Sequence, residues 1–353
     1  MFEVNIQKKL PHFELNISFS LKNGVLAILG SSGCGKSMTL KCIAGITNPD
    51  SGYITNNGKH LFNSEKNISL HARERKIGYV FQNYALFPHM TVYQNISYGL
   101  SVFNRSKNHS DVRAIIDKVC LTGLEKRLPN QLSGGQQQRC ALARTLITNP
   151  DILLLDEPFS AADGHTKHIL ESELIAIIKN NFHKPVLLVT HNIEEAYRLS
   201  DKIMIIENGK SVQTSSKKEI IDHPSSVNAA RITGCKNIFP AEIISSSGKE
   251  TIIKCSEMTI HAAGIVPEKD NISIGIRAHY INILSEQTQG ENIFTCKITE
   301  VIEGIFSTTV IAECGGNLIR AEIAKTSDVL KVCRKNKKMF IQMPPDKIFF
   351  ITE

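Results

Sequence analysis

The sequence lacks any long apolar run. No stretch of its 353 residues approaches the roughly 20 consecutive apolar residues that a bilayer-crossing helix requires. The N-terminal segment MFEVNIQKKLPHFEL also lacks the apolar core of a secretory signal peptide. These absences exclude a helical membrane protein, and they predict a protein that stays in the cytosol.

Metal-binding cysteine patterns and long tracts of one charge are missing as well. The nine cysteines form no CxxC pair and no cluster with histidine at metal-ligand spacing, so we expect reduced, mostly buried thiols rather than a zinc site. The formal net charge is +7, and the basic residues are scattered along the chain. This distribution gives no indication of a nucleic-acid partner.

The first two thirds of the chain alternate apolar runs with amphipathic stretches of helical length. The runs VLAILG, DILLLDEP, PVLLVTH and KIMIIENG are typical of strands that are buried on both faces of a parallel sheet. Helices are predicted over Lys36–Gly45, Ser110–Cys120, Gly134–Thr148 and His165–Phe182. We therefore predict an α/β domain with a mostly parallel sheet over residues 1–225. The Asn208-Gly209 pair predicts a hairpin turn after the last run.

The pattern changes after about Pro224. From Asn237 onward, short strand-like runs are separated by Gly, Ser, Asn and Asp, and helical periodicity fades except near Lys325–Val332. These features predict a small all-β barrel over residues 235–353, joined to the first domain by a linker near His223–Gly234.

A glycine-rich loop follows the first buried strand. Gly30-Ser31-Ser32-Gly33-Cys34-Gly35-Lys36-Ser37 fits the pattern GxxxxGK followed by Ser or Thr, and it lies between a predicted strand and a predicted helix. Its backbone N–H groups could surround phosphates, Lys36 could reach the β and γ phosphates, and the Ser37 hydroxyl could ligate Mg²⁺. The alternative is a glycine-rich turn that binds nothing.

Two carboxylates end another apolar strand, Ile152-Leu153-Leu154-Leu155-Asp156-Glu157. In this position Asp156 would lie beside the metal ion, and Glu157 would be free to polarise an attacking water. A strand that ends in two acids is common, so the evidence comes from its combination with the glycine-rich loop.

A second Ser/Gly-rich turn, Leu132-Ser133-Gly134-Gly135-Gln136, opens the predicted helix at 134–148. A helix N-terminus of this kind offers a second anion site, although one nucleotide needs only one phosphate cradle. The economical explanation is that this turn closes over a nucleotide held by another copy of the chain, so that two chains enclose two ATP molecules.

Together, the glycine-rich loop, Gln82, the Ser133 turn, the Asp156-Glu157 strand and Thr190-His191 resemble the motifs of the ATP-binding cassette (ABC) family in their order. The resemblance covers roughly residues 1–225, with a helical subdomain at about 83–150. It implies an ATPase that uses ATP and Mg²⁺. By this resemblance, Gln82 contacts Mg²⁺ or water and His191 holds the γ-phosphate, while Ser133, Gly135 and Gln136 reach that phosphate from the opposite subunit.

Several residues keep a second interpretation. His191 alone could be an ordinary histidine at a strand end, and Gln82 alone could be a polar surface residue. Asp163 lies at the family's dimer-contact loop, but it could also cap the helix that begins nearby. Phe13 is nearest to the position of the family's adenine-stacking aromatic, but it could equally be a core residue of an N-terminal hairpin.

Two positions depart from the family pattern. Met38 follows Ser37 where the family usually has threonine, which removes one hydroxyl from the α-phosphate while leaving backbone N–H contacts. Ala162 replaces the usual leucine of the dimer loop, and this change should weaken packing rather than chemistry.

The resemblance extends to transport. In transport members of the family, the region corresponding to Asn83–Tyr98 forms a groove that receives a short permease helix. The β-rich tail and the stretches 57–89 and 292–325 resemble subunits of molybdate importers, although sulfate, ferric-iron and polyamine subunits share much of this pattern. If the tail regulates uptake by binding the oxyanion, Ser307, Thr308 and Thr309 are candidate donors, or they are ordinary strand residues.

We therefore expect an energy-coupling subunit at the cytoplasmic face of the membrane. Its partners would be a second copy, membrane permease subunits and, indirectly, an extracytoplasmic substrate-binding protein, with no nucleic acid. A soluble cassette ATPase acting on nucleic acid or ribosomes would normally carry two cassettes or long coiled insertions, which this chain lacks. An anion sensor with a decayed cassette conflicts with the intact Lys36, Asp156, Glu157 and His191.

Overall fold

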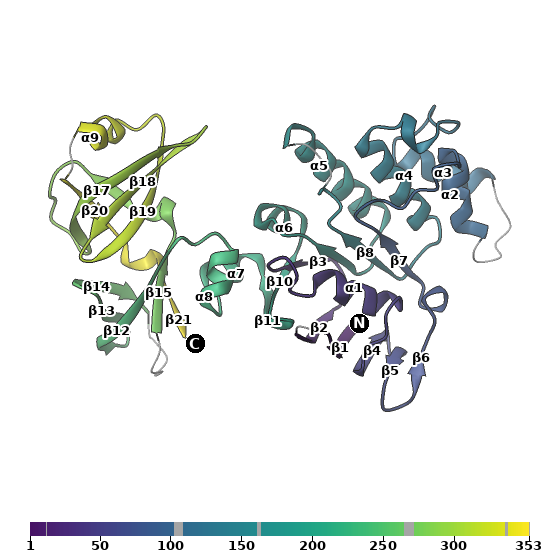
Figure 1. Cartoon of the computed structure of the whole chain (residues 1–353), viewed down its shortest axis with the longest axis horizontal. Coiled ribbons are helices and arrows are strands. Elements are labelled where there is room, and N and C mark those ends of the chain that lie inside the picture. The colour runs from purple at the N-terminus through teal and green to yellow at the C-terminus, as the bar shows by residue number, and fades with distance from the viewer. Residues whose placement is uncertain (12, 102–108, 161–163, 265–271, 336–337, 353) are drawn as a thin grey trace. The chain divides into compact units, whose positions relative to one another are not determined.

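The computed structural model describes residues 1–11, 13–101, 109–160, 164–264, 272–335 and 338–352. The chain divides into two compact units, Met1–Lys217 and Lys218–Glu353 (Figure 1). Within the described ranges, every helix is too short or too polar to span a bilayer.

The first unit is built on a mixed sheet, which has eleven strands in the part of the chain that the structure describes. The strand order is β6 (Ile68–Ser69), β5 (Lys59–Asn63), β4 (Ser51–Asn56), β1 (Phe2–Lys9), β2 (Glu14–Leu21), β11 (Lys210–Ser216), β10 (Lys202–Glu207), β3 (Val25–Leu29), β9 (Val186–Val189), β8 (Ile152–Asp156) and β7 (Ile77–Val80). Strands β10, β3, β9, β8 and β7 run parallel, as the apolar runs predicted for β10, β3, β9 and β8. Strand β7 was not among the predicted runs.

The remainder of this sheet is mainly antiparallel because several of its strands are joined as hairpins. The predicted Asn208-Gly209 hairpin is confirmed between β10 and β11, with both turn residues at positive φ. Asn57 and Gly58 form the same kind of turn between β4 and β5. Paired positive φ angles match the right-handed twist of the strands that they connect. The N-terminal hairpin of β1 and β2 packs beside these strands.

The sequences of the parallel strands are unbroken apolar runs because both faces of these strands are buried. All residues of β3, β8 and β9 are buried. Along β8, Leu153 and Leu155 belong to one hydrophobic cluster and Leu154 belongs to the cluster on the opposite face. This alternation follows from the two-residue repeat of side chains along a strand.

Helices flank the sheet. They are α1 (Lys36–Ala44), α2 (Val92–Ser101), α3 (His109–Lys118), α4 (Gly134–Leu146), α5 (Gly164–Asn181) and α6 (Ile193–Leu199). Helices α1, α3, α4 and α5 lie at the predicted positions, whereas α2 and α6 were not predicted. Helices α2, α3 and α4 gather near the β7 edge of the sheet (Figure 1). These three helices fall in the range 83–150, where a helical subdomain was expected.

Arg75 anchors the C-terminal end of α1 although it is 1% exposed. Its Nη1 donates to the carbonyl oxygens of Cys42 and Ile43 at 2.8 and 2.9 Å, and its Nε donates to Leu70 O at 2.9 Å. Two of these bonds add charged donors to carbonyls of the last turn of α1, and the third ties that turn to Leu70.

We expect Arg75→Met to lower the free energy of unfolding by about 2–4 kcal/mol, because buried carbonyls lose charged donors. Urea unfolding followed by circular dichroism measures this change. Arg73→Met, which removes an exposed arginine two residues away, is the matched control. Equal stability of the two variants would contradict the anchoring role.

The second unit contains two five-stranded antiparallel sheets within the described ranges. The first sheet has the strand order β14 (Met258–Ala263), β13 (Glu250–Cys255), β12 (Asn237–Ser247), β15 (Ile272–Ile276) and β21 (Ile348–Thr352). The second sheet has the strand order β16 (Asn282–Leu284), β20 (Lys338–Gln342), β17 (Ile293–Glu303), β18 (Ser307–Cys314) and β19 (Asn317–Ala324). One hydrophobic cluster takes residues from both sheets, among them Ile253 and Ala312. The predicted β-rich C-terminal domain is confirmed, and helix α9 (Val329–Lys335) lies near the position where helical periodicity was expected.

The segment expected to be a linker, 223–234, contains a helix and packs within the second unit. Helix α7 (Lys217–Asp222) precedes it, and α8 (Val227–Ile232) lies inside it. Ala230 belongs to a buried cluster with Phe349 and Ile351, and Arg277 Nη1 donates to Thr233 O at 2.7 Å. The prediction of a linker was therefore wrong. The residues that contact this segment, in β21 and at Arg277, are distant from it in the sequence, so the local sequence gave no indication of the packing.

One pair of cysteines departs from the expectation of reduced thiols. Cys296 and Cys314 form a disulfide across the antiparallel strands β17 and β18, with their Cα atoms 4.5 Å apart. Residues that face each other across two antiparallel strands are close enough to form a disulfide. The spacing of Cys296 and Cys314 in the sequence does not by itself indicate that they pair. The other seven cysteines are free, and of these Cys120 is exposed.

Candidate nucleotide site

The glycine-rich loop runs from the end of β3 to the start of α1, as predicted. Gly35 has φ 107°, and a Cβ atom there would lie 2.6 Å from Leu15 Cδ1. A Cβ atom on Gly30 would lie 2.5 Å from Ile206 O. The loop can therefore follow this path only with glycine at these two positions.

Lys36 holds its ammonium group over the same loop. The side chain is 6% exposed, and its Nζ donates to Gly30 O at 2.8 Å and to Ser31 O at 2.9 Å. A buried ammonium group placed at a loop of inward-facing backbone is a favourable partner for phosphate. Cys34 is buried in this loop, and burial raises the pKa of its thiol.

The Ser37 hydroxyl and the Asp156 carboxylate meet at the ends of α1 and β8. Ser37 Oγ donates to Asp156 Oδ1 at 2.9 Å, and Asp156 is 7% exposed. Both groups are hard oxygen donors, which is the ligand type that Mg²⁺ prefers. Two of the three predicted metal ligands, Ser37 and Asp156, therefore lie together and fit a magnesium ion, whereas the third, Gln82, contacts Glu157.

Tyr79 of β7 is a third member of this cluster that the sequence interpretation missed. Its hydroxyl donates to Asp156 Oδ2 at 2.7 Å. Burial, together with the neighbouring Asp156 carboxylate, raises the pKa of Tyr79, so the phenol remains a donor. Its position three residues before Gln82 on an apolar strand gave no chemical signal.

Glu157 lies beside two of the other three predicted catalytic residues. Its Oε2 lies 3.4 Å from Gln82 Nε2 and 3.8 Å from His191 Nδ1. The Glu157 backbone has φ 44°, a conformation that is rare for a residue other than glycine, and its N–H donates to Val189 O at 3.0 Å. The chain end of β8 is thus bent so that the carboxylate faces Gln82 and His191.

A buried network supports the turn that carries His191. Thr190 Oγ1 donates to Glu195 Oε2 at 2.5 Å and accepts from the Asn192 N–H at 3.0 Å. Glu195 is 3% exposed and forms an ion pair with Lys167 of α5. These contacts, which the sequence interpretation also missed, connect the histidine turn to α5.

Phe13 lies at the same cavity as the glycine-rich loop. The cavity has a volume of about 440 Å³, and its walls include Phe13, Ser32, Gly33, Met38 and Glu157. Phe13 also packs against the core cluster of β1, β2 and β3. The structure therefore brings this aromatic ring to the loop, which is compatible with both of its predicted roles.

We expect Phe13→Ala to weaken ATP binding about tenfold if the ring stacks on the adenine base. Phe13→Leu separates the two roles, because leucine fills the core but offers no aromatic face. Fluorescent-nucleotide titration of both variants measures the effect. Restoration of wild-type affinity by leucine would show that Phe13 acts only as a core residue.

The second Ser/Gly-rich turn begins α4 and is well ordered by its own contacts. Ser133 Oγ accepts from the Gln136 N–H at 3.3 Å, and Gln136 Oε1 accepts from the Ser133 N–H at 3.0 Å, which forms a capping box. A Cβ atom on Gly135 would lie 2.2 Å from Leu170 Cδ2, whereas one on Gly134 would have no atom within 4 Å. The described residues that line the cavity of the glycine-rich loop include no member of this turn.

The predicted site also includes the dimer-contact loop with Ala162 and Asp163. Asp163 and Ala162 lie outside the described residues, so their predicted roles stay predictions.

Comparison with known proteins shows which family this chain belongs to. The ABC transporter family model matches residues 15–160. The Fe(3+) ions import ATP-binding protein FbpC of Brucella abortus is 39% identical over 260 residues, which cover 72% of this chain and 72% of that protein. The sulfate/thiosulfate import ATP-binding protein CysA 2 of Shewanella oneidensis is 33% identical over 362 residues, which cover 98% of each. This chain belongs to the ABC transporter family.

A solved ABC structure shares the fold of the cassette. It is a dimeric ATP-binding cassette in a post-hydrolysis state bound to ADP and Pi, and it matches with a TM-score of 0.52 and 26% identity. The match covers 62% of this chain and 99% of that chain. The chain is accordingly an ABC-type ATPase with ATP as its nucleotide.

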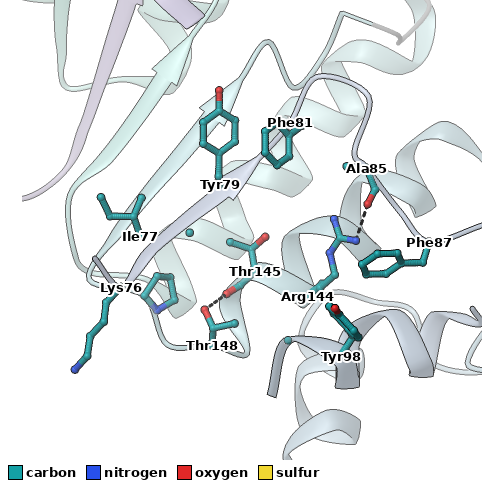
Figure 2. A pocket seen from close by; sticks show the side chains of 13 residues that line it. Lys76, Ile77, Tyr79, Phe81, Ala85, Phe87, Tyr98, Arg144, Thr145 and Thr148 are labelled. Atoms are coloured by element: carbon teal, nitrogen blue, oxygen red, sulfur yellow. Dashed lines mark hydrogen bonds between the residues drawn. The ribbon is translucent and has the colours of Figure 1, made fainter. Parts of the chain in front are cut away.

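The ABC cassette also has an apolar groove along the edge strand β7 (Figure 2). Its volume is about 510 Å³, and Tyr79, Phe81, Phe87, Tyr98 and Arg144 contribute to its walls. The predicted groove segment 83–98 supplies two of these residues.

Arg144 shapes one side of the groove. Its Nη1 donates to Ala85 O at 2.7 Å, and its guanidinium carbon lies 5.4 Å from the centre of the Phe87 ring. Phe87 in turn packs against Tyr98 with the ring centroids 4.7 Å apart. These contacts hold the segment after Gln82 in a fixed shape against α4, and Figure 2 shows Phe87 and Tyr98 on the Arg144 side of the groove.

Proposed function

We propose that this chain is the ATP-hydrolysing subunit of a bacterial importer for an inorganic ion. The observation that carries this proposal is the convergence of Lys36, Ser37 and Asp156 on one loop, with Glu157 held beside Gln82 and His191. The names of the relatives support the import role, since FbpC and CysA 2 are both named as import ATP-binding proteins.

The chemistry follows from this geometry. Lys36 and the N–H groups of the loop bind the β and γ phosphates, and Glu157 accepts hydrogen bonding from the attacking water and polarises it. Gln82 orients that water, and His191 binds the γ-phosphate. Ser37 and Asp156 would hold Mg²⁺, which would supply positive charge beside the phosphates. Asp156 ends the parallel strand β8, Glu157, Gln82 and His191 follow the ends of β8, β7 and β9, and Lys36 and Ser37 begin α1 after the loop that follows β3.

The ATPase is proposed to act as a homodimer in which each site takes residues from both chains. Ser133, Gly134, Gly135 and Gln136 form an anion-binding turn at a helix N-terminus, and they do not line the cavity of their own glycine-rich loop. Exposure of Ser133 and Gly134 supports an approach to the partner's nucleotide. Asp163 is proposed to contribute at the same interface.

The groove along β7 is proposed to receive a short helix of a permease subunit at the cytoplasmic face of the membrane. Its aromatic walls fit the apolar side of such a helix. Closure of the dimer on ATP would then move two grooves together, and hydrolysis would release them. An extracytoplasmic binding protein would deliver the cargo to the permease.

We propose a tetrahedral oxyanion as the cargo, either molybdate, as the sequence resemblance suggests, or sulfate. The relative that extends over 98% of the chain is named for sulfate and thiosulfate, which supports the oxyanion class. Ferric iron is the second candidate, because the iron-importer relatives are more identical over the part that they match. Polyamine import, also considered from the sequence, has no support among these relatives.

Transport measurements in proteoliposomes test the function and separate the cargoes. The chain, its permease and its binding protein are reconstituted, and ATP-dependent uptake of molybdate, sulfate and ferric iron is compared. We expect accumulation of one oxyanion, with no uptake when Lys36 is replaced by alanine. Uptake of ferric iron alone would reject the oxyanion proposal, and ATP-independent uptake would reject the energy-coupling role.

The second unit is proposed to regulate this ATPase through the imported anion. Thr308 is 1% exposed, and the Ser307 hydroxyl donates to the Glu322 carboxylate at 2.5 Å. The Glu322 carboxylate disfavours an anion at the Ser307 hydroxyl in this conformation, and burial keeps the Thr308 hydroxyl away from an anion in solvent. A titration of transporter ATPase activity with molybdate and with sulfate checks the regulatory role, and an unchanged rate over a wide concentration range would contradict it.

A further inference from the structure

Tyr79 belongs to two sites at once. Its side chain lines the groove of Figure 2 beside Phe81, with the ring centroids 4.2 Å apart and the ring planes inclined by 22°. Its hydroxyl donates to Asp156 Oδ2 at 2.7 Å. One side chain therefore joins the wall of the groove to the carboxylate of the nucleotide site.

The register of the central strands produces this contact. Strands β7 and β8 are parallel, and Tyr79 lies opposite Leu154. Asp156 is two residues beyond Leu154, so its side chain lies on the same face of the sheet as Tyr79. A phenol is long enough to reach diagonally to that carboxylate, whereas phenylalanine would fill the same wall of the groove without reaching it.

The two oxygens of Asp156 have different donors. Oδ1 accepts from Ser37 of α1, and Oδ2 accepts from Tyr79 of β7. Ser37 is also a proposed magnesium ligand, so its hydroxyl would bind the metal ion as well as Asp156. The Tyr79 bond is then the contact that keeps the plane of this 7%-exposed carboxylate fixed.

We propose that Tyr79 is a positioning residue that orients Asp156 for the magnesium ion, and that the permease helix proposed for the groove acts on Asp156 through the Tyr79 ring. This inference rests on the proposed function, because it assumes that Asp156 serves a metal–nucleotide site. It adds a physical connection between the groove and that site.

The first test compares wild type with Tyr79→Phe in the full-length chain. Electron paramagnetic resonance measures Mn²⁺ binding in the presence of a non-hydrolysable ATP analogue. We expect the Mn²⁺ affinity to fall about tenfold, since a buried carboxylate loses one hydrogen bond. The affinity for the same analogue in EDTA should stay at the wild-type value. Tyr53→Phe, which removes the hydroxyl of a 37%-exposed tyrosine on β4, is the matched control.

Each outcome of this test decides the proposal. An unchanged or tighter Mn²⁺ affinity in Tyr79→Phe overturns it. An equal loss of analogue affinity in EDTA, or a large drop in melting temperature, assigns Tyr79 a merely structural role and also overturns it. If the wild-type chain itself binds no Mn²⁺ with the analogue, the proposed function fails first, and the two failures are thereby distinguished.

A second variant tests the connection through the ring. Phe81→Ala removes the ring that stacks on Tyr79 from the groove while keeping the Tyr79 hydroxyl. We expect Mn²⁺ affinity to fall about threefold, because an aromatic pair of this kind contributes modestly to side-chain order. Wild-type Mn²⁺ affinity in Phe81→Ala would overturn the part of the proposal that routes groove occupancy through Tyr79.

Discussion

Glu157→Gln should lower ATP turnover about 100-fold or more while leaving ATP binding intact. Glutamine has nearly the same shape, so the bent backbone at position 157 and the contacts near Gln82 and His191 should persist. It is a much weaker base than a carboxylate, however, and it cannot polarise the attacking water to the same degree. ATP should therefore remain bound, and dimers should accumulate.

Two measurements check this expectation. Phosphate release gives the turnover, and size-exclusion chromatography with ATP gives the fraction of dimer. Glu65→Gln, an exposed carboxylate in the turn between β5 and β6, is the matched control and should behave as wild type. Substantial turnover in Glu157→Gln would move the role of general base to another residue.

Gly134→Leu should abolish turnover without harming the fold. A side chain at position 134 meets no atom of its own chain within 4 Å, and glycine is a poor residue for a helix, so stability should be unchanged or slightly higher. If this turn closes on the nucleotide of a partner chain, the new side chain blocks that approach. We expect turnover to fall at least about 100-fold, as for loss of a phosphate-contacting donor.

ATP binding by a single chain serves as the reference for this variant. The affinity of a single chain for ATP should stay constant, since the turn does not line that cavity. Gly248→Leu, in a turn of the second unit where a Cβ atom also meets nothing within 4 Å, controls for the added apolar side chain. Full turnover by Gly134→Leu, or turnover by a strict monomer, would contradict a site shared between two chains.

Most of the nucleotide site was predictable because its parts are local in sequence. The loop from Gly30 to Ser37 specifies its own conformation through glycine and its own chemistry through Lys36 and Ser37. Asp156 and Glu157 follow an apolar strand, and parallel strands present their carboxyl ends at one edge of a sheet. The meeting of Ser37 with Asp156 at 2.9 Å is the expected result of that topology.

Other features depend on contacts between distant segments. Phe13 reaches the glycine-rich loop because the β1–β2 hairpin folds beside it, and the segment at 223–234 packs because β21 returns to it. The disulfide between Cys296 and Cys314 depends on the register of β17 and β18. Composition and spacing carry no information about such pairings, since each segment is an ordinary strand or turn by itself.

The sequence by itself determined the α/β cassette, the β-rich second unit and the residues that we propose for phosphate binding and catalysis, because short-range patterns of glycine, apolar residues and charge encode them. Only the tertiary structure decided that Tyr79 bonds to Asp156, that the segment 223–234 packs against β21, and that half of the large sheet is antiparallel. These facts follow from strand register and from the packing of segments far apart in the chain, which are set by the whole core rather than by any one motif.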